Sequence, residues 1–447
     1  MTYGTASLRA PVAARPGAGP PPGAFPSPAL PRLLPGHGAV PVELATHLSR
    51  LGPVPYRGVP GALIPEVKAA GLTGRGGAAF PTYRKLAAMA GYARAPVVVG
   101  NGAEGEPASR KDKSLLWISP HLVLDGLQLA AEAVGSPAVG LYVHRSRRLH
   151  AHLAAAIRQR AAAGLDALTV ELFEAPPRFL AGEESALASV TSGGAALPRY
   201  KPPRASQRGV AGQPTLVQNV ETLAHLALIA RYGAGWFRAA GTSDEPGSML
   251  ATVHRHGGRT DVLEVPIGVG IGDLLAVRGP GDGVQAVLVG GYHGAWLGAD
   301  EAARLPLANA ALRPAGTAIG AGVVAALPAD RCGIAETARV TRYLALESAG
   351  QCGPCFNGLP RMAAALEHLA GPYPDRQALT DLQRWAGLVE KRGACHHPDG
   401  TVRFVRSALR VFAAEAARHE RGRCVATAGP PFLPLPRQAP IDHADWR

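Results

Sequence analysis

The chain has 447 residues, of which 47% are hydrophobic, and a formal net charge of +13. This length suits roughly two to four domains, and the apolar fraction can build a core, which excludes a chain that is disordered throughout. Five cysteines, an odd and sparse set, argue against a disulfide framework. The basic residues are mostly Arg and form no run interleaved with aromatic residues, so we expect no nucleic acid partner.

The two ends of the chain are rich in proline and small residues, which predicts loose tails over 1–47 and 421–447. The start has no apolar core of signal-peptide length, and the most apolar late run, at 315–327, is shorter than a membrane span. We therefore expect a cytoplasmic protein without a membrane span, peripheral to a membrane only through a partner.

Residues 48–240 alternate between helix-like and strand-like segments, which predicts an α/β domain. Helices are expected at 64–70, 82–90 and 121–134, and strands beginning at 97, 138 and 168. Residues 241–330 contain the short strands MLATVHRHG, TDVLEVPIG and VQAVLVGG, which fit a small β-grasp (ubiquitin-like) domain. Residues 331–420 repeat apolar residues every three or four positions in four segments, which predicts a helical bundle. These four segments are 336–347, 359–370, 375–391 and 402–419.

Two motifs come directly before helices. GRGGAAF at 74–80 lets a ligand approach the backbone, and the next helix offers free N–H groups to phosphate. A helix rather than a strand precedes it, unlike the dinucleotide fingerprint, and a tight structural turn is an equal alternative. Lys85 could reach a phosphate, although a single lysine is more often solvated. In PTLVQNVETLA, Gln218 and Asn219 could bind the polar edge of a heterocycle or cap a helix.

Two acidic loops follow a strand or precede a helix. NGAEGEP comes directly after an apolar strand, where ligands bind in open α/β sheets. Its Glu104 and Glu106 must be paired or bound if they are buried, and a solvated loop is the alternative. In FLAGEESAL, Glu183 and Glu184 could bind a ligand or only stabilise the N-terminus of the next helix.

The cysteines favour an iron–sulfur cluster. Cys352 and Cys355 form C-x-x-C between two expected helices, and Cys395 lies beyond a further helix, a spacing that lets thiolates share one cluster. Zinc with three Cys and either His396 or His397 is the alternative, or an empty site. A redox C-x-x-C is less suitable because no thioredoxin-like strand precedes it. Two cysteines lack partners at ligand spacing and are expected to be structural, namely Cys332 and Cys424.

Taken in order, several long phrases resemble one family over residues 50–420. They are GLTGRGGAAFPT, NGAEGEPASRKD, PHLVLDGLQLAA, GEESAL, LPRYKPPRA, PTLVQNVETLA and ESAGQCGPC. The family is the flavin-carrying NADH-binding subunit (the 51 kDa or F subunit) of respiratory complex I, with its hydrogenase and formate-dehydrogenase relatives. The resemblance implies an α/β flavin-binding domain, a β-grasp (SLBB-like) domain and a C-terminal four-helix iron–sulfur domain that holds a 4Fe–4S cluster.

The resemblance also implies roles for single residues. A hydride passes from NADH to FMN, and electrons leave through the cluster to a partner such as a ferredoxin-like subunit or a membrane reductase. FMN would lie near Gly74, Arg75, Gly76, Lys85, Asn101, Glu104, Gly182, Glu183 and Asn219. The nicotinamide side would involve Gly76, Gly77, Phe80, Glu106, Glu184 and Lys201, with Glu106 and Glu184 as the catalytic candidates.

The cysteine set departs from the family at Ala349, where the family has a fourth cysteine. Cys352, Cys355 and Cys395 then need a fourth ligand such as water or one of the following histidines. Without that ligand, the cluster becomes a 3Fe–4S cluster or is lost. A non-catalytic assembly or ligand-binding subunit, with zinc or no metal at the cysteines, is the alternative function.

The nucleotide site departs from the family as well. The family places aromatic rings around the adenine, where this chain has Ala88 and Arg204. Loss of both stacking faces weakens the hold on the adenine, although an arginine can stack on a base. Ala103 also replaces an acidic residue beside the flavin, and Gln218 replaces an asparagine.

Overall fold

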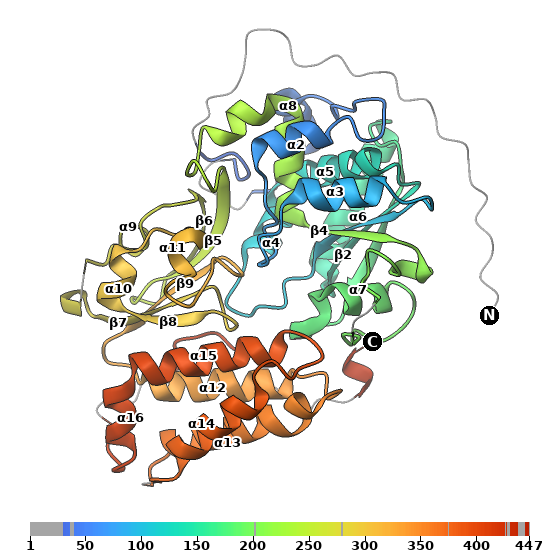
Figure 1. Ribbon diagram of the computed structural model, residues 1–447. Coiled ribbons are helices and arrows are strands. Elements are labelled where there is room, and N and C mark those ends of the chain that lie inside the picture. Colours follow the sequence, from blue (N-terminus) through green and yellow to red (C-terminus); the bar gives the residue numbers. More distant parts are fainter. Residues whose placement is uncertain are drawn as a thin grey trace.

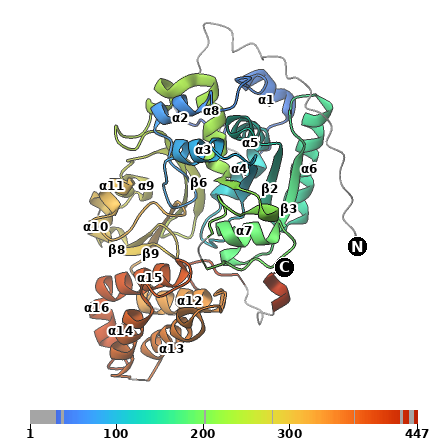
Figure 2. The same ribbon diagram turned by 45° about the vertical axis from the view of Figure 1, so that its right-hand side comes forward.

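The computed structural model describes residues 30–35, 40–200, 203–278, 280–373, 375–424, 426, 430–436 and 443–446. Figure 1 shows an α/β part drawn blue to green, a mixed sheet drawn yellow, and a helical C-terminal part that lies beneath both. Figure 2 shows the same arrangement from a second direction. The expected site residue Lys201 lies outside the described residues.

The α/β part is built on a parallel sheet of order β3-β2-β1-β4. Its strands are β1 (Val97–Gly102), β2 (Ala138–His144), β3 (Val170–Ala175) and β4 (Thr215–Asn219). The first three lie where the alternating pattern predicts strands. β4 was not expected, because five residues ahead of a capped helix carry too short a pattern. Helices surround the sheet: α2 (Ile64–Ala70), α3 (Thr82–Ala90), α4 (Lys111–Ile118), α5 (Pro120–Val134), α6 (Arg147–Ala162), α7 (Glu184–Val190) and α8 (Val220–Arg238).

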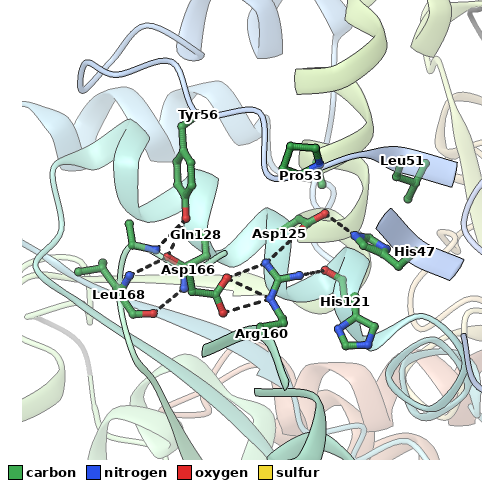
Figure 3. Close-up of polar contacts among 12 residues, drawn as sticks. His47, Leu51, Pro53, Tyr56, His121, Asp125, Gln128, Arg160, Asp166 and Leu168 are labelled. Atoms are coloured by element: carbon green, nitrogen blue, oxygen red, sulfur yellow. Dashed lines mark hydrogen bonds and ion pairs between the residues drawn. The ribbon is translucent and has the colours of Figure 1, made fainter. Parts of the chain in front are cut away.

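A buried ion network joins the helices of this part around Asp125 on α5 (Figure 3). Its carboxylate lies 2.8 Å from Nη2 of Arg160 in α6 and 2.9 Å from Nε2 of His47 in α1 (Leu44–Leu51). Arg231 of α8 also pairs with it. Burial favours the neutral acid, but Arg231, His47 and Arg160 outweigh burial and hold the pKa of Asp125 well below its usual range. The network therefore ties α1, which spans the expected tail boundary at residue 47, to the rest of the part.

The second part is a five-stranded mixed sheet of order β6-β5-β9-β7-β8. Its strands are β5 (Ser248–His254), β6 (Thr260–Pro266), β7 (Val284–Val289), β8 (Ala295–Gly298) and β9 (Val323–Pro328). β5 and β9 are parallel, and the other neighbours are antiparallel. Three short helices accompany the sheet: α9 (Ile271–Leu275), α10 (Ala299–Arg304) and α11 (Asn309–Leu312).

The C-terminal part consists of helices that pack against β8 through α15. They are α12 (Gly333–Leu346), α13 (Leu359–Ala370), α14 (Ala378–Val389), α15 (His397–Val411) and α16 (Ala413–His419), with the short helical turn Pro354–Gly358 before α13. The single helix expected over 402–419 is therefore two helices, which meet at Phe412, whose ring is buried.

The tails pack more than the proline-rich composition predicts, at least where they are described. Leu33 in the N-terminal tail and Leu433 in the C-terminal tail are each only 1% exposed. Trp446 is buried against the α/β part. Single apolar side chains anchor these segments, and such isolated anchors leave no periodic signal in a sequence. Among the described residues, no helix has the length and apolar character that a bilayer crossing requires.

Candidate flavin and iron–sulfur sites

The amides of two neighbouring strands meet at the carboxyl end of the parallel sheet. Asn101 of β1 and Asn219 of β4 are paired in register. The glycine-rich turn crosses this edge so closely that a Cβ added to Gly76 would lie 3.3 Å from the Cβ of Asn219. A side chain at residue 76 would therefore crowd the sheet edge, which explains the glycine there.

The other expected loops reach the same edge. Asn101 donates from Nδ2 to the Gly182 carbonyl at 2.8 Å. Lys85 donates from Nζ to Glu184 Oε1 at 2.9 Å and to the Val217 carbonyl at 3.3 Å. The turn at 74–80, the loop after β1, the segment before α7 and the end of β4 therefore lie together at one edge of the sheet.

Some of the expected ligand residues already stabilise helix N-termini. Glu183 Oε2 accepts hydrogen bonds from the N–H groups of Ser185 and Ala186 at the start of α7. Asn219 Oδ1 accepts one from the N–H of Glu221 at the start of α8. The helix-capping alternative that the sequence left open therefore holds for both residues.

Glu104 and Glu106, on one loop, are both buried but face different partners. Glu104 accepts hydrogen bonds from Ser109 Oγ at 2.5 Å and from the N–H groups of Asp112 and Lys113 in α4. Glu106 accepts one from the N–H of Tyr292 at 2.7 Å, in the turn between β7 and β8. Burial raises the pKa of Glu106 to about 7. Glu106 thus joins the α/β part to the mixed sheet.

Three other predicted residues of the glycine-rich turn, Arg75, Phe80 and Gly77, differ in burial and in backbone conformation. The guanidinium of Arg75 is buried and donates to Thr73 Oγ1 at 2.8 Å and to the Ser248 carbonyl at 3.3 Å, so it supports the turn. Phe80 is 45% exposed. Gly77 adopts a φ of +106°, which strongly favours glycine.

Sequence reasoning missed the charges that surround Asn219. Asp112 accepts a hydrogen bond from Asn219 Nδ2 at 2.8 Å and pairs with Lys111 at 2.7 Å. Lys111 also pairs with Glu221 at 2.8 Å. The only available signal was the RKD at the end of NGAEGEPASRKD, which carries no pattern that separates a buried ion pair from a solvated helix start.

An unpartnered donor at this edge fits a flavin. Gln218 is buried, and its Nε2 has no hydrogen-bond partner among the described residues. A buried N–H group without an acceptor is costly. The polar edge of a flavin ring would supply the acceptor, and Lys85, which pairs with Glu184, would supply a cation for a phosphate.

The thiols of Cys352, Cys355 and Cys395 come together after α12. Cys355 is buried, and burial followed by the neighbouring Cys352 and Cys395 raises the pKa of its thiol. Three neighbouring thiols suit an iron–sulfur cluster or a zinc ion, since thiolates are ligands for both.

The two candidate histidine ligands differ in availability. His397 is buried, and its Nε2 and Nδ1 lie 2.8 Å from the Leu344 carbonyl and 3.0 Å from His293 Nε2. Both ring nitrogens of His397 are therefore occupied. His396 is exposed at the start of α15, so the structure favours His396 or water over His397 as a fourth ligand.

Comparisons with known proteins assign both regions of the chain to one family. Residues 67–228 match the Nuo51 FMN-binding domain, and residues 335–419 match the NADH-ubiquinone oxidoreductase-F iron-sulfur binding region. The chain is 31% identical to the F subunit of NADH-quinone oxidoreductase from Streptomyces coelicolor, over 86% of this chain and 88% of that protein. The second F subunit of the same enzyme from Rhizobium meliloti is 29% identical, over 82% and 90%.

Solved structures agree with these relatives. An NAD+-reducing NiFe hydrogenase in the air-oxidized state is 31% identical with a TM-score of 0.76, covering 88% of this chain and 69% of that one. The H2-reduced state is 32% identical with a TM-score of 0.74, covering 81% of this chain and 62%, less than two thirds, of that one. From its two matched regions and its identity to these relatives, the chain belongs to the family of the NADH-quinone oxidoreductase F subunits.

Proposed function

We propose that this protein passes electrons from NADH through FMN to an iron–sulfur cluster and on to a partner protein. The observation that carries the proposal is a direct contact between two segments. One is the flavin-side loop, which includes Phe179 and leads into α7, and the other is formed by the ends of α12 and α15 next to the cysteines. The N–H of Phe179 donates to Glu347 at 2.9 Å, five residues before Cys352. The Phe179 ring also packs against His397, two residues after Cys395, with ring centroids 5.7 Å apart.

FMN suits this role because it accepts two electrons as a hydride and releases them singly. The residues proposed to hold it are those predicted from the sequence: Gly74, Arg75, Gly76, Lys85, Asn101, Glu104, Gly182, Glu183 and Asn219. The buried Gln218 amide would orient the ring edge. Arg75 and Glu104 would act by holding the turn and the β1 loop, since their side chains already have protein partners.

NADH is proposed to approach from the exposed side of the glycine-rich turn, where Phe80 could stack on the nicotinamide. Gly76, Gly77 and Glu184 would line this side; Lys201, the remaining residue predicted here, lies outside the described residues. Glu106 would hold the loop after β1 in position by accepting a hydrogen bond from the N–H of Tyr292. The adenine positions Ala88 and Arg204 are exposed, which fits a weak hold on that end of the nucleotide.

We propose three domains, namely an FMN/NADH-binding domain at 48–240, a β-grasp (SLBB-like) domain at 241–330, and a four-helix iron–sulfur domain at 331–420. The strand order of the mixed sheet supports the second assignment. Its strands run second, first, fifth, third, fourth, with the first and fifth parallel, as in a ubiquitin-like sheet. Helices α12 to α15 would form the iron–sulfur domain, with α16 as an addition.

The electron-accepting partner is proposed to dock beside the cysteines, as a ferredoxin-like subunit or a membrane reductase on the cytoplasmic side. Phe356, the neighbour of Cys355, is 72% exposed. Leu346 and Leu388, on the adjoining α12 and α14, are also exposed. Exposed apolar groups of this kind commonly mark a protein interface.

The test is flavin and metal analysis of protein purified without oxygen, with an absorption spectrum before and after addition of NADH. We expect FMN, iron and sulfide, and bleaching of the flavin by NADH. Flavin and iron without bleaching would keep the electron-transfer role but point to another donor. Zinc or no metal, without flavin, would favour the alternative of a non-catalytic assembly protein, for which the missing ligand at Ala349 is the specific observation.

A further inference from the structure

A second group of metal-ligand side chains lies at the other end of the C-terminal part. Four side chains each offer one donor atom there, and these atoms all lie within 4.8 Å of one another: Cys332, Glu415, His419 and Cys424. Cys332 precedes α12, whereas Cys352 follows it. The 14 residues of α12 make a helix about 21 Å long, so this group is separate from the cysteines proposed to hold the cluster.

The donor distances fit one tetrahedral ion. Cys332 Sγ lies 3.2 Å from His419 Nε2, and Glu415 Oε1 lies 4.0 Å from the same nitrogen. Zinc ligands at about 2.0–2.3 Å stand roughly 3.3–3.8 Å from one another in a tetrahedron. Adjustments of a few tenths of an ångström would therefore bring these three donors onto one ion.

The fold positions the donors from three segments. Glu415 and His419 are four residues apart on α16 and so lie on one face of that helix. Phe412, at the start of α16, packs so closely on the N-terminus of α12 that a Cβ added to Gly333 would lie 2.4 Å from its ring. This contact holds the face of α16 that carries Glu415 and His419 against Cys332. The chain after α16 then brings Cys424 close to the same three residues.

Groups behind the donors favour coordination. The N–H of Ala335 donates to Cys332 Sγ at 3.2 Å, which stabilises a thiolate. The His419 ring is also hydrogen-bonded to the Leu369 backbone, which holds the ring in place while Nε2 points at Cys332. Glu415 and His419 are buried, whereas Cys424 is exposed and leaves a path for an ion from solvent.

We propose that Cys332, Glu415, His419 and Cys424 bind one zinc ion, which fastens α16 and the following segment to the start of α12. Two thiolates, an imidazole and a carboxylate form a ligand set that zinc accepts, and a set of four protein ligands leaves no open position, as in structural sites. The sequence showed no partner at ligand spacing for Cys332 or Cys424, whereas the fold brings Glu415 and His419 close to both. Sequence spacing could not reveal the group, because 82 residues separate Cys332 from the Glu415/His419 pair.

The test measures zinc and iron per chain in full-length protein by mass spectrometry of the metals. Cys424→Ser is the main variant, because the residue is exposed and its replacement leaves the packing intact. Cys395→Ser is the matched control, since it removes a thiol from the other cysteine group. We expect about one zinc per chain in the wild type and in Cys395→Ser, and loss of that zinc in Cys424→Ser with its iron retained.

Two results would overturn the proposal. One is zinc content that is unchanged between the wild type and Cys424→Ser. The other is a Cys332–Cys424 disulfide in the natively purified protein, seen as a mass lower by two hydrogens and restored by reductant. Cobalt substitution provides an independent readout, because thiolate-to-cobalt absorption bands should arise in Cys395→Ser and be lost when Cys332→Ser and Cys424→Ser are added to that variant.

Discussion

The flavin-side loops and the cysteine loop differ in how their chemistry is built. The flavin side is built largely from glycines and helix N-termini, and the departures from the family at Ala103 and Gln218 concern side chains only. The cysteine side relies on one thiolate for each iron, so Ala349 removes a whole ligand. A site built from backbone tolerates substitution, whereas a site built from single donor atoms loses function one ligand at a time.

The largest expected effect is on the cysteine side. Cys355→Ser should abolish the cluster, because only two cysteines of the set would remain, while FMN binding should persist. Iron, sulfide and flavin analysis of anaerobically purified protein measures both. Cys424→Ser is the control that should keep its iron. Loss of flavin together with iron would mean that the two regions depend on each other for folding.

The matching change on the flavin side is Gly105→Ala. A Cβ at residue 105 would lie 2.2 Å from the Phe179 carbonyl oxygen, so the β1 loop must shift. We expect a loss of about 1–3 kcal/mol in stability and a fall in FMN affinity of at least about tenfold, with iron content retained. Flavin titration by fluorescence measures the affinity. Gly235→Ala, where an added Cβ meets nothing within 4 Å, should leave the affinity unchanged.

Restoring the fourth thiolate would sharpen the comparison. Ala349 is partly buried beside the flavin-side loop, and the cysteine side chain is only one sulfur atom larger. We expect Ala349→Cys to hold four irons per cluster and to lose iron in air at least severalfold more slowly than the wild type. Ala349→Ser is the size-matched control without a thiol. Equal rates of iron loss in the cysteine and serine variants would show that the wild type already has an effective fourth ligand.

The smallest expected effect is a pH dependence at the junction of the two sheets. Burial raises the pKa of Glu106 from 4.5 to about 7, so the folded protein retains a proton that the unfolded chain loses. The wild type should therefore lose stability, relative to Glu106→Gln, as the pH rises from about 4.5 to about 7. Thermal unfolding midpoints of both proteins across this range give the difference, in which the other titrating groups cancel. A constant difference would mean that Glu106 stays ionised throughout.

Local patterns predicted much of this fold. Three of the four parallel strands lie at the alternating segments, and the helices after residue 330 lie close to their periodic segments. Several elements could not be found this way, among them β4, β8, β9 and the break before α16. β4 is too short to carry a period. The expected helix at 402–419 breaks at Phe412, whose ring is buried against the N-terminus of α12. The break in this helix depends on the packing of Phe412 against α12, which begins about 80 residues earlier in the chain.

The sequence by itself determined the family and pointed to the loops proposed to carry the chemistry, because glycines, paired acids and C-x-x-C are local signals that need no partner to be recognised. Only the tertiary structure decided what each side chain does. Glu104 caps α4, Glu106 reaches the second sheet, and Cys332 meets three other donors. These roles depend on which distant groups lie within hydrogen-bonding or coordination distance, and that distance follows from the packing of the whole chain rather than from any segment of it.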